Sequence, residues 1–271
     1  KWGFFPSAAI AWRVTEEGFL KDNSVINNLK LRLSYGESGN NAVDNYSTIL
    51  GTSSTQYDFD GTNANGQYLN RIKNDKLGWE KSKEINLGLD FAFWGGRLAG
   101  NVELYNKKTY DLILSQKIPQ TNGFDNVGAV NVGATRNKGL EIGLNTVNIQ
   151  TKDFSWTTNL SFATNKNEIT EIFGDSKDYP DQKLFIGQPV LVHYDYAWDG
   201  IWQTSEKDEA SKYGRLPGAV KEVDQDNSGT ITPDKDRVIL GTPFPDWTGS
   251  ITNTFTYKDF DFSVFIYTRQ G

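Results

Sequence analysis

A strict alternation of apolar and polar residues between Glu84 and Tyr105 constrains the fold of this chain more than any other feature. Every second position of Ile85–Phe93 is apolar, and after the turn Trp94–Arg97 the alternation resumes from Leu98 to Leu104. A period of two over about ten residues is typical of a β-strand with one apolar and one polar face. In a soluble sandwich the apolar face covers a core. In an outer-membrane barrel it faces lipid, and the polar face lines the lumen.

The same alternation recurs along the chain, which extends the argument from one hairpin to a whole sheet. It is clear in five further segments and weaker in a sixth: Leu29–Tyr35, Leu140–Asn145, Trp156–Phe162, Ile251–Tyr257, Phe260–Tyr267 and Phe4–Val14. Together these segments predict roughly eight strands of membrane-spanning length. We expect the apolar set of each strand to face lipid and the intervening residues to face the lumen.

The connections between the predicted strands alternate in length. We expect short ones at Trp94–Arg97, Asn148–Lys152 and Lys258–Asp259, a moderate one at Thr15–Asn28, and long ones at Gly36–Lys83, Lys108–Asn137 and Asn167–Asp246. Short turns at one end and long loops at the other are typical of outer-membrane barrels. Compact soluble domains rarely contain several structureless connections beyond about 15 residues. We therefore predict an all-β fold, an antiparallel transmembrane β-barrel with long extracellular loops, partial because the chain supplies about eight strands of a larger barrel. A soluble β-sandwich is the alternative.

Composition excludes several classes of protein. The 271 residues contain no apolar run long enough for a transmembrane helix, although 37% of them are hydrophobic. The absence of cysteine excludes disulfides, thiolate metal sites and cysteine nucleophiles from this sequence. A net charge of −6 without a Lys/Arg-rich run argues against nucleic-acid binding. Because methionine is absent even at position 1 and the chain stops inside a strand pattern, we expect a portion of a longer polypeptide.

Several segments resemble the C-terminal barrel region of SusC/RagA-type TonB-dependent transporters, in the same order as in that family. The matching segments are Phe4–Phe19, Leu29–Asn40, Leu77–Leu114, Asn131–Leu144, Tyr196–Gln203, Pro217–Trp247 and the closing pair of strands through Phe265. The resemblance implies an outer-membrane barrel of about 22 strands, of which residues 1–271 form part, with the plug domain and final strands absent here. It also implies active import of large nutrients, oligosaccharides or peptides, energised through TonB. A SusD-like surface lipoprotein would serve as a lid, and outer-membrane lipid would surround the barrel.

One motif suggests a metal site in the last long loop. Residues 224–231 follow the first eight positions of an EF-hand-like calcium loop, with oxygen-bearing side chains at positions 1, 3 and 5 and glycine at position 6. Position 12, where an acid is expected, is Lys235, but Asp236 one residue later would restore the ligand set. The alternative is a solvated turn rich in Asp, Asn and Gly. The expected ligands of a structural calcium ion are the side chains of Asp224, Asp226, Ser228 and Asp236 and the backbone carbonyl of Thr230.

The remaining candidates indicate no enzyme. His193 is the only histidine, so neither a conventional zinc site nor a catalytic triad can be built around it. Four aromatic residues in the last long loop could stack on sugar rings, although we expect a structural role for them: Tyr194, Tyr196, Trp198 and Trp202. Two functions other than active import remain open, a passive porin-like channel and a calcium-stiffened surface-binding or adhesion protein.

Overall fold

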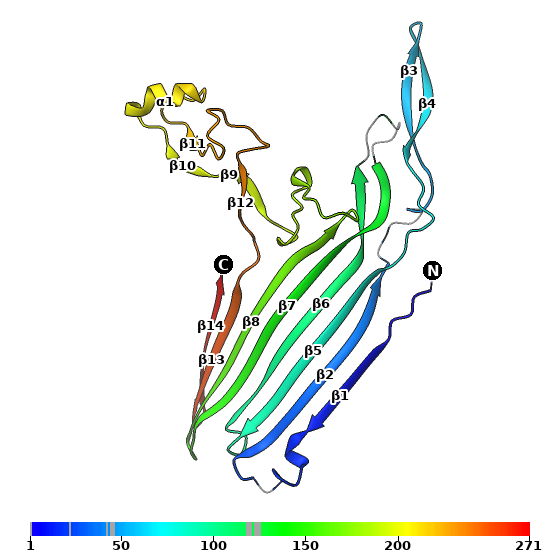
Figure 1. The fold of residues 1–271 in the computed structure, drawn as a ribbon. Helices are drawn as coiled ribbons and strands as arrows, with labels where there is room; N and C mark the ends of the chain where they lie inside the picture. The colour runs from blue at the N-terminus through cyan, green and yellow to red at the C-terminus, as the bar shows by residue number, and fades with distance from the viewer. Residues whose placement is uncertain (1, 22, 42, 44–46, 118–120, 122–125) are drawn as a thin grey trace.

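Eight long strands form one antiparallel sheet in the computed structural model, which describes residues 2–21, 23–41, 43, 47–117, 121 and 126–271 (Figure 1). The order across the sheet is β1-β2-β5-β6-β7-β8-β13-β14, so each strand pairs with its neighbours in the order of the chain. The expectation of about eight strands in an antiparallel barrel-type sheet is confirmed. The bounds are β1 Ser7–Arg13, β2 Ile26–Asn40, β5 Glu80–Phe93, β6 Leu98–Lys117, β7 Asn126–Gln150, β8 Phe154–Ile172, β13 Trp247–Tyr257 and β14 Phe260–Gln270.

The register of the sheet aligns the apolar positions of neighbouring strands. Leu33 pairs with Leu87, Leu87 with Leu104, and Leu104 with Leu140. Directly paired residues lie on the same face of an antiparallel sheet, so the alternating leucines form one continuous apolar face, called the outer face here. The intervening polar residues share the opposite, inner face. Leu33, Leu87 and Leu104 are each about half exposed, so these side chains cover no protein core.

The strands β6, β7 and β8 extend well beyond the alternating segments. β7 begins at Asn126 and pairs with β6 along nearly its whole length, so most of the expected long loop Lys108–Asn137 is strand. The centre of that expected loop, residues 118–120 and 122–125, lies outside the described residues, as do residue 22 and residues 42 and 44–46 of two other expected connections. Backbone pairing needs no apolar face. The alternation therefore marked the lipid-facing part of each strand and missed the rest.

The connections at one end of the sheet are tight. Tyr257 and Phe260 flank a two-residue turn in which Lys258 has a φ of +50°. The β5–β6 turn contains Gly95 and Gly96, with φ values of +68° and +85°, a backbone conformation that glycine adopts without steric cost. A 3-10 helix, η1 (Val14–Glu16), begins the β1–β2 connection at the same end (Figure 1).

The other end carries folded insertions. The β2–β5 connection contains a hairpin of β3 (Gly51–Phe59) and β4 (Thr62–Arg71), which projects beyond the sheet (Figure 1). The β8–β13 connection contains two short strand pairs, β9 with β12 and β10 with β11, next to helical segments. Its elements are η3 Pro180–Gln182, β9 His193–Tyr196, β10 Trp198–Ile201, η4 Thr204–Glu206, α1 Lys207–Lys212, β11 Val220–Glu222 and β12 Arg237–Gly241.

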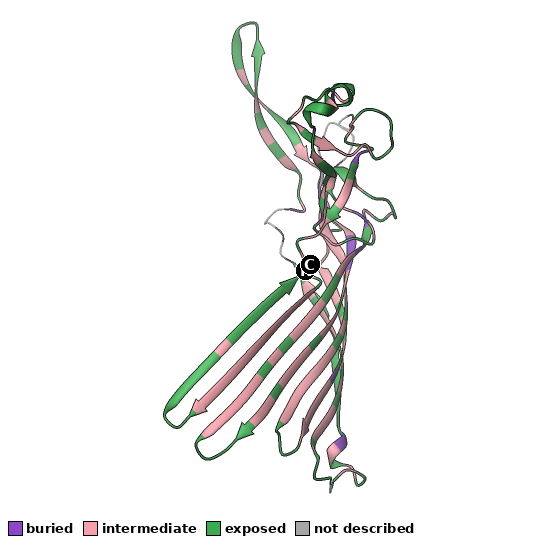
Figure 2. Ribbon diagram, turned by 90° about the vertical axis from the view of Figure 1, so that its left-hand side faces the viewer, coloured by how far each residue is buried: buried purple, intermediate pink, exposed green. Residues whose placement is uncertain are grey.

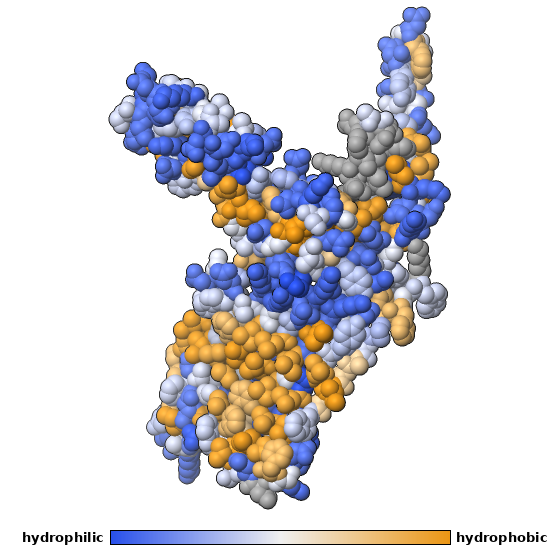
Figure 3. Space-filling model, in the orientation of Figure 1, coloured by the Kyte–Doolittle hydropathy of each residue, from blue (hydrophilic) through white to orange (hydrophobic). Residues whose placement is uncertain are grey.

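Burial differs sharply between the sheet and the loops. Seen from the side, the sheet is a single curved layer whose strands are half-buried or exposed over most of their length (Figure 2). Fully buried side chains, among them Ala134 and Ile172, occur where β7 and β8 leave the apolar region. Others, such as Trp202, lie in the β8–β13 connection. Figure 3 shows an apolar region over the lower part of the strands and a polar region directly above it. No helix among the described residues is long and apolar enough to cross a membrane.

Candidate functional site

The β8–β13 connection has a small core of its own around Trp202. This side chain is only 4% exposed and stacks on Tyr213, with the ring centroids 5.9 Å apart. The Nζ atom of Lys221 lies 4.7 Å from the centre of the Trp202 ring, a cation–π geometry. Ala210 of α1 is completely buried. The segment from β10 to β11 is therefore held by packing of the kind found in soluble domains.

The helical segment that covers this core starts at a defined point. The carboxylate of Glu206 accepts a hydrogen bond from the backbone N–H of Gln203 at 2.9 Å, which satisfies a donor that the first turn leaves free. Glu206 also pairs with Lys221 at 2.9 Å. The same carboxylate therefore fixes the start of the helical segment and joins it to β11.

The acidic turn, residues 224–236, connects β11 to β12 next to that core. Three of the predicted ligands, Asp224, Asp226 and Asp236, each place a carboxylate oxygen within 4.8 Å of the others. Among the described residues this is the one group of three or more His, Cys, Asp or Glu side chains close enough to share a metal ion. Hard divalent cations such as calcium are bound by clustered carboxylate and carbonyl oxygens.

Backbone N–H groups support two of the three carboxylates. Asp224 accepts hydrogen bonds from Gly229 N at 2.7 Å and from Ser228 N at 3.1 Å. Asp236 is fully buried and accepts from the backbone N–H groups of Gln225 and Thr232 at 2.8 and 2.6 Å. These bonds meet the requirement that a buried polar group be hydrogen-bonded. The Asp236 carboxylate thereby ties the beginning of the acidic turn to its end.

Hydrogen bonding also lowers the pKa of Asp224. Partial removal of the carboxyl from water raises its pKa, but the N–H donors of Gly229 and Ser228 lower it by more, so the net pKa lies below the ordinary value. The hydroxyl of Tyr213 lies 3.3 Å from the same carboxylate. Since the Tyr213 ring stacks on Trp202, this contact joins the acidic turn to the small core.

The other two predicted ligands lie in the same turn but are arranged differently. The Ser228 hydroxyl donates a hydrogen bond to the carbonyl oxygen of Thr230 at 3.0 Å, so the two oxygens expected to bind calcium bind each other. Ser228 N also contacts Asp226 at 3.1 Å. Asn227 and Gly229 adopt φ values of +56° and +81°, the left-handed conformation expected where the turn reverses direction. A metal ion would therefore have to replace the Ser228–Thr230 hydrogen bond in order to use all five ligands.

The aromatic residues of this connection have different environments. Trp202 is buried, whereas Trp198 is 70% exposed. Tyr194 packs against Phe185 at 4.8 Å, and Tyr196 lies under the guanidinium of Arg237 at 5.3 Å. Three of the four aromatic side chains are therefore engaged in packing, as expected for a structural role. Trp198 is the one whose ring is open to solvent.

The inner face carries a charged network that the sequence analysis did not identify. Arg32 of β2 donates to both oxygens of Asp90 on β5, at 2.9 and 2.8 Å, and to Glu103 on β6 at 2.8 Å. Gly88 lies directly opposite Arg32, and a Cβ atom there would approach the guanidinium to 2.7 Å. Alternation assigns these side chains to one face, but only the register shows that three strands meet at Arg32.

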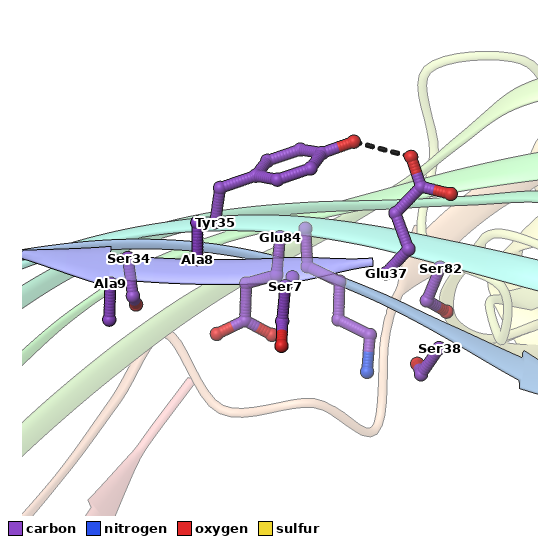
Figure 4. Close-up of a pocket in the computed structure, with 11 residues that line it drawn as sticks. Ser7, Ala8, Ala9, Ser34, Tyr35, Glu37, Ser38, Ser82 and Glu84 are labelled. Carbon is purple, nitrogen blue, oxygen red and sulfur yellow. Dashed lines mark hydrogen bonds between the residues drawn. The ribbon is translucent and has the colours of Figure 1, made fainter. Parts of the chain in front are cut away.

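A polar recess of about 430 Å³ lies where β1, β2 and β5 meet. In Figure 4 Tyr35 and Glu37 project to one side of the strands, whereas Ser7, Ser34 and Glu84 project to the other. The phenol of Tyr35 donates to Glu37 at 2.5 Å. The hydroxyl and carboxylate groups of the second set are typical of a wall that faces water rather than lipid. This recess adds a second polar feature to the inner face.

Comparison with known proteins identifies the family of this sheet. Residues 1–271 match the family described as TonB dependent receptor-like, beta-barrel. The chain is 36% identical over 286 residues to TonB-dependent receptor P26 of Formosa agariphila, covering 100% of the chain and 28% of that relative. It is 35% identical over 276 residues to TonB-dependent receptor SusC of Bacteroides thetaiotaomicron, covering 97% of the chain and 27% of that relative.

A solved structure described as the RagAB peptide transporter is also similar. It matches 97% of the chain and 29% of its own chain with a TM-score of 0.75 and 25% identity. The chain thus spans less than a third of the length of these relatives. The soluble β-sandwich is excluded, and the chain belongs to the TonB-dependent receptor β-barrel family, whose members are outer-membrane proteins and not enzymes.

Proposed function

We propose that this chain forms part of the wall and extracellular surface of an active importer of large nutrients, oligosaccharides or peptides. The observation that carries the proposal is the combination of a polar inner wall, centred on Arg32, with folded insertions at one end of the sheet. Relatives named SusC and RagAB peptide transporter support a transport role. In this proposal the inner face lines the path of the cargo, and the insertions meet partners outside the cell.

Energy coupling separates this proposal from a passive porin-like channel. The experiment deletes the gene for the full-length protein, restores it, and measures uptake of labelled oligosaccharide and peptide pools with and without TonB. We expect uptake to depend on both the restored gene and TonB. Uptake that persists without TonB would favour the passive channel. If the deletion strain takes up both pools normally, the surface-binding or adhesion function becomes the better account.

We also propose that a SusD-like lipoprotein docks on the folded insertions as a lid. The insertions extend beyond the sheet, and the hairpin β3–β4 and helix α1 lie at the same end of the molecule (Figure 1). Single cysteines can report on this surface because the chain contains no cysteine. Tyr57→Cys and Asp208→Cys should react with an impermeant maleimide on intact cells and become protected by the lipoprotein. Lys258→Cys, in a tight turn at the opposite end, should not react.

Finally, we propose that the acidic turn binds calcium as a structural ion and performs no chemistry. Three carboxylates within 4.8 Å of one another repel when ionised, and a divalent cation would relieve that repulsion and fix the turn. Because the acid is displaced from position 12, the affinity should be modest, about 10⁻⁴–10⁻³ M as in extracellular modules. The test compares limited proteolysis of the acidic turn with and without calcium, in the wild type and in the Asp224→Ala/Asp226→Ala variant. Identical cleavage in all four samples would leave the solvated turn as the explanation.

A further inference from the structure

A band of basic residues crosses the outer face immediately above the apolar region. The register places six cations from four neighbouring strands on this face: Lys81 and Lys83 of β5, Lys108 of β6, Arg136 and Lys138 of β7, and Lys166 of β8. Along β7, Lys138 lies two residues beyond Leu140, or about 7 Å along the strand. Because the strands are tilted, residues further along β5 and β6 reach the height of Lys166 on β8. The six side chains therefore form a band at one depth.

Half of these cations have carboxylate partners. Lys81 pairs with Asp111 at 3.5 Å, Lys83 with Glu37 at 3.4 Å, and Arg136 with Glu168. Lys108, Lys138 and Lys166 are exposed and make no ion pair with any described residue. Glu171 lines the same recess of about 350 Å³ as Lys108 but forms no ion pair with it. Three positive charges are thus left without local compensation.

The register makes this arrangement unfavourable without an added anion. Lys138 lies directly opposite Lys166, and Lys108 directly opposite Arg136. Like charges directly opposite each other on neighbouring strands are destabilising. An anion between the strands would turn each repulsion into an attraction. The position next to the apolar face indicates where such an anion would come from, because lipid headgroups lie at this depth.

The opposite end of the outer face has a different composition. The outward positions next to the tight turns carry aromatic residues such as Trp12, Trp156 and Tyr257, and no lysine or arginine among the described strand residues. Aromatic side chains are common at both membrane interfaces, so they distinguish neither end. Lysines that merely extend into the interface would be expected at both ends, whereas the basic band lies at the long-loop end alone. That end faces outside the cell in outer-membrane barrels.

We infer that the basic band, centred on Lys108, Lys138 and Lys166, binds the phosphate groups of anionic glycolipid in the outer leaflet of the outer membrane. The lipid chains lie against the apolar face below, and the phosphates bridge the opposed lysines of β7 and β8. Figure 3 shows the polar region in direct contact with the apolar one on this face, as such a ligand requires. The inference rests on membrane location and register, and it holds whether or not the barrel imports nutrients.

The test uses the full-length transporter purified in detergent. Binding of bisphosphorylated lipid A, and of the same lipid with both phosphates removed, is measured by titration and by native mass spectrometry. Lys108→Ala/Lys138→Ala/Lys166→Ala should raise the apparent Kd for the phosphorylated lipid on the order of 100-fold, since each basic residue near a membrane surface contributes about fivefold. The matched control, Lys76→Ala/Lys177→Ala/Lys207→Ala, removes three exposed loop lysines and should leave the Kd unchanged.

Further arms make each result decisive. The triple lysine-to-arginine variant should retain binding, because the charges remain. Equal affinity of the triple alanine variant and its control, or equal binding of the dephosphorylated lipid, would overturn the inference. Displacement of the lipid by millimolar inorganic phosphate would show a site for the free ion instead. If the triple alanine variant does not assemble, Lys138→Ala alone should still raise the Kd about fivefold, and an unchanged Kd would reject the band as a lipid site.

Discussion

The spanning strands and the β8–β13 connection place their apolar side chains against different partners. In the sheet, Leu87 and Leu104 remain about half exposed on the outer face, where lipid completes the packing. In the connection, Trp202 is 4% exposed because Tyr213, Lys221 and the α1 region surround it. The first region needs a membrane in order to bury its apolar surface, whereas the second buries it alone. Substitutions can therefore separate the stability of the loop region from that of the barrel.

The largest expected effect is local to the loop region. Trp202→Ala removes the centre of the small core and should destabilise it by about 3–5 kcal/mol, the range for a buried aromatic truncated to alanine. Hydrogen exchange and proteolysis should then increase between residues 198 and 240, with no change in the spanning strands. Trp198→Ala is the matched control, because that side chain is 70% exposed. Similar losses from both variants would show that the loop has no core.

The corresponding test of the sheet is a charge on the outer face. Leu87→Arg should cost about 2–4 kcal/mol if the position lies near the bilayer midplane. Asn86→Arg, one residue away on the inner face, should be tolerated because that side chain meets water. Urea-induced unfolding of the full-length protein in liposomes measures both variants. Equal destabilisation by the two arginines would reverse or abolish the assignment of faces.

A smaller effect is expected from close packing between strands. A Cβ atom on Gly139 would lie 2.3 Å from the Tyr105 ring and 2.6 Å from the carbonyl oxygen of Thr164. Gly139→Ala must displace backbone and should destabilise the sheet by about 1–3 kcal/mol. At Gly88 the added Cβ meets only the movable end of Arg32, so Gly88→Ala should cost less. The same unfolding assay ranks the two, and the reverse order would contradict the packing argument.

The smallest effect concerns acid. Because the pKa of Asp224 is lowered in the folded protein, its hydrogen bonds stabilise the acidic turn above the ordinary carboxyl pKa of about 3.9. That stabilisation is lost as the pH falls through the folded-state pKa. Pepsin cleavage within residues 224–236 should therefore increase below about pH 4, relative to the Asp224→Asn variant at the same pH. A parallel pH dependence in the two proteins would exclude Asp224 as the responsible group.

Sequence patterns predicted the two regions unequally well. Alternation identified the lipid-facing parts of β2, β5 and β6, since lipid demands an apolar side chain at every second position. It could not show that β7 begins as early as Asn126, because above the apolar region nothing constrains the outer positions. The cluster of Asp224, Asp226 and Asp236 followed from spacing within one turn. The contact of Arg32 with Asp90 and Glu103 required the register of three strands, which depends on the exact lengths of the connections.

The aromatic residues show the same limit in the loop region. Trp198 and Trp202 are four positions apart and chemically identical, yet one is exposed and the other buried. Their difference arises from the α1 region, whose start is fixed by Glu206 and Gln203. A tertiary contact of this kind leaves no periodic signal. Sequence alone therefore indicated a cluster of rings but not which ring would remain available to a ligand.

The pairing of β9 with β12 has a consequence for the order of assembly. β8 ends at Ile172 and β13 begins at Trp247, so 74 residues must be looped out before these two strands can pair. Once β9 and β12 have paired, the open chain is reduced to residues 173–192 and 242–246, a total of 25. Since the entropic cost of closure grows with the logarithm of loop length, this threefold shortening lowers the cost by about 1 kcal/mol. A connection that folds first thus acts as a splint, bringing the edge of β13 to β8 before the seam between them closes.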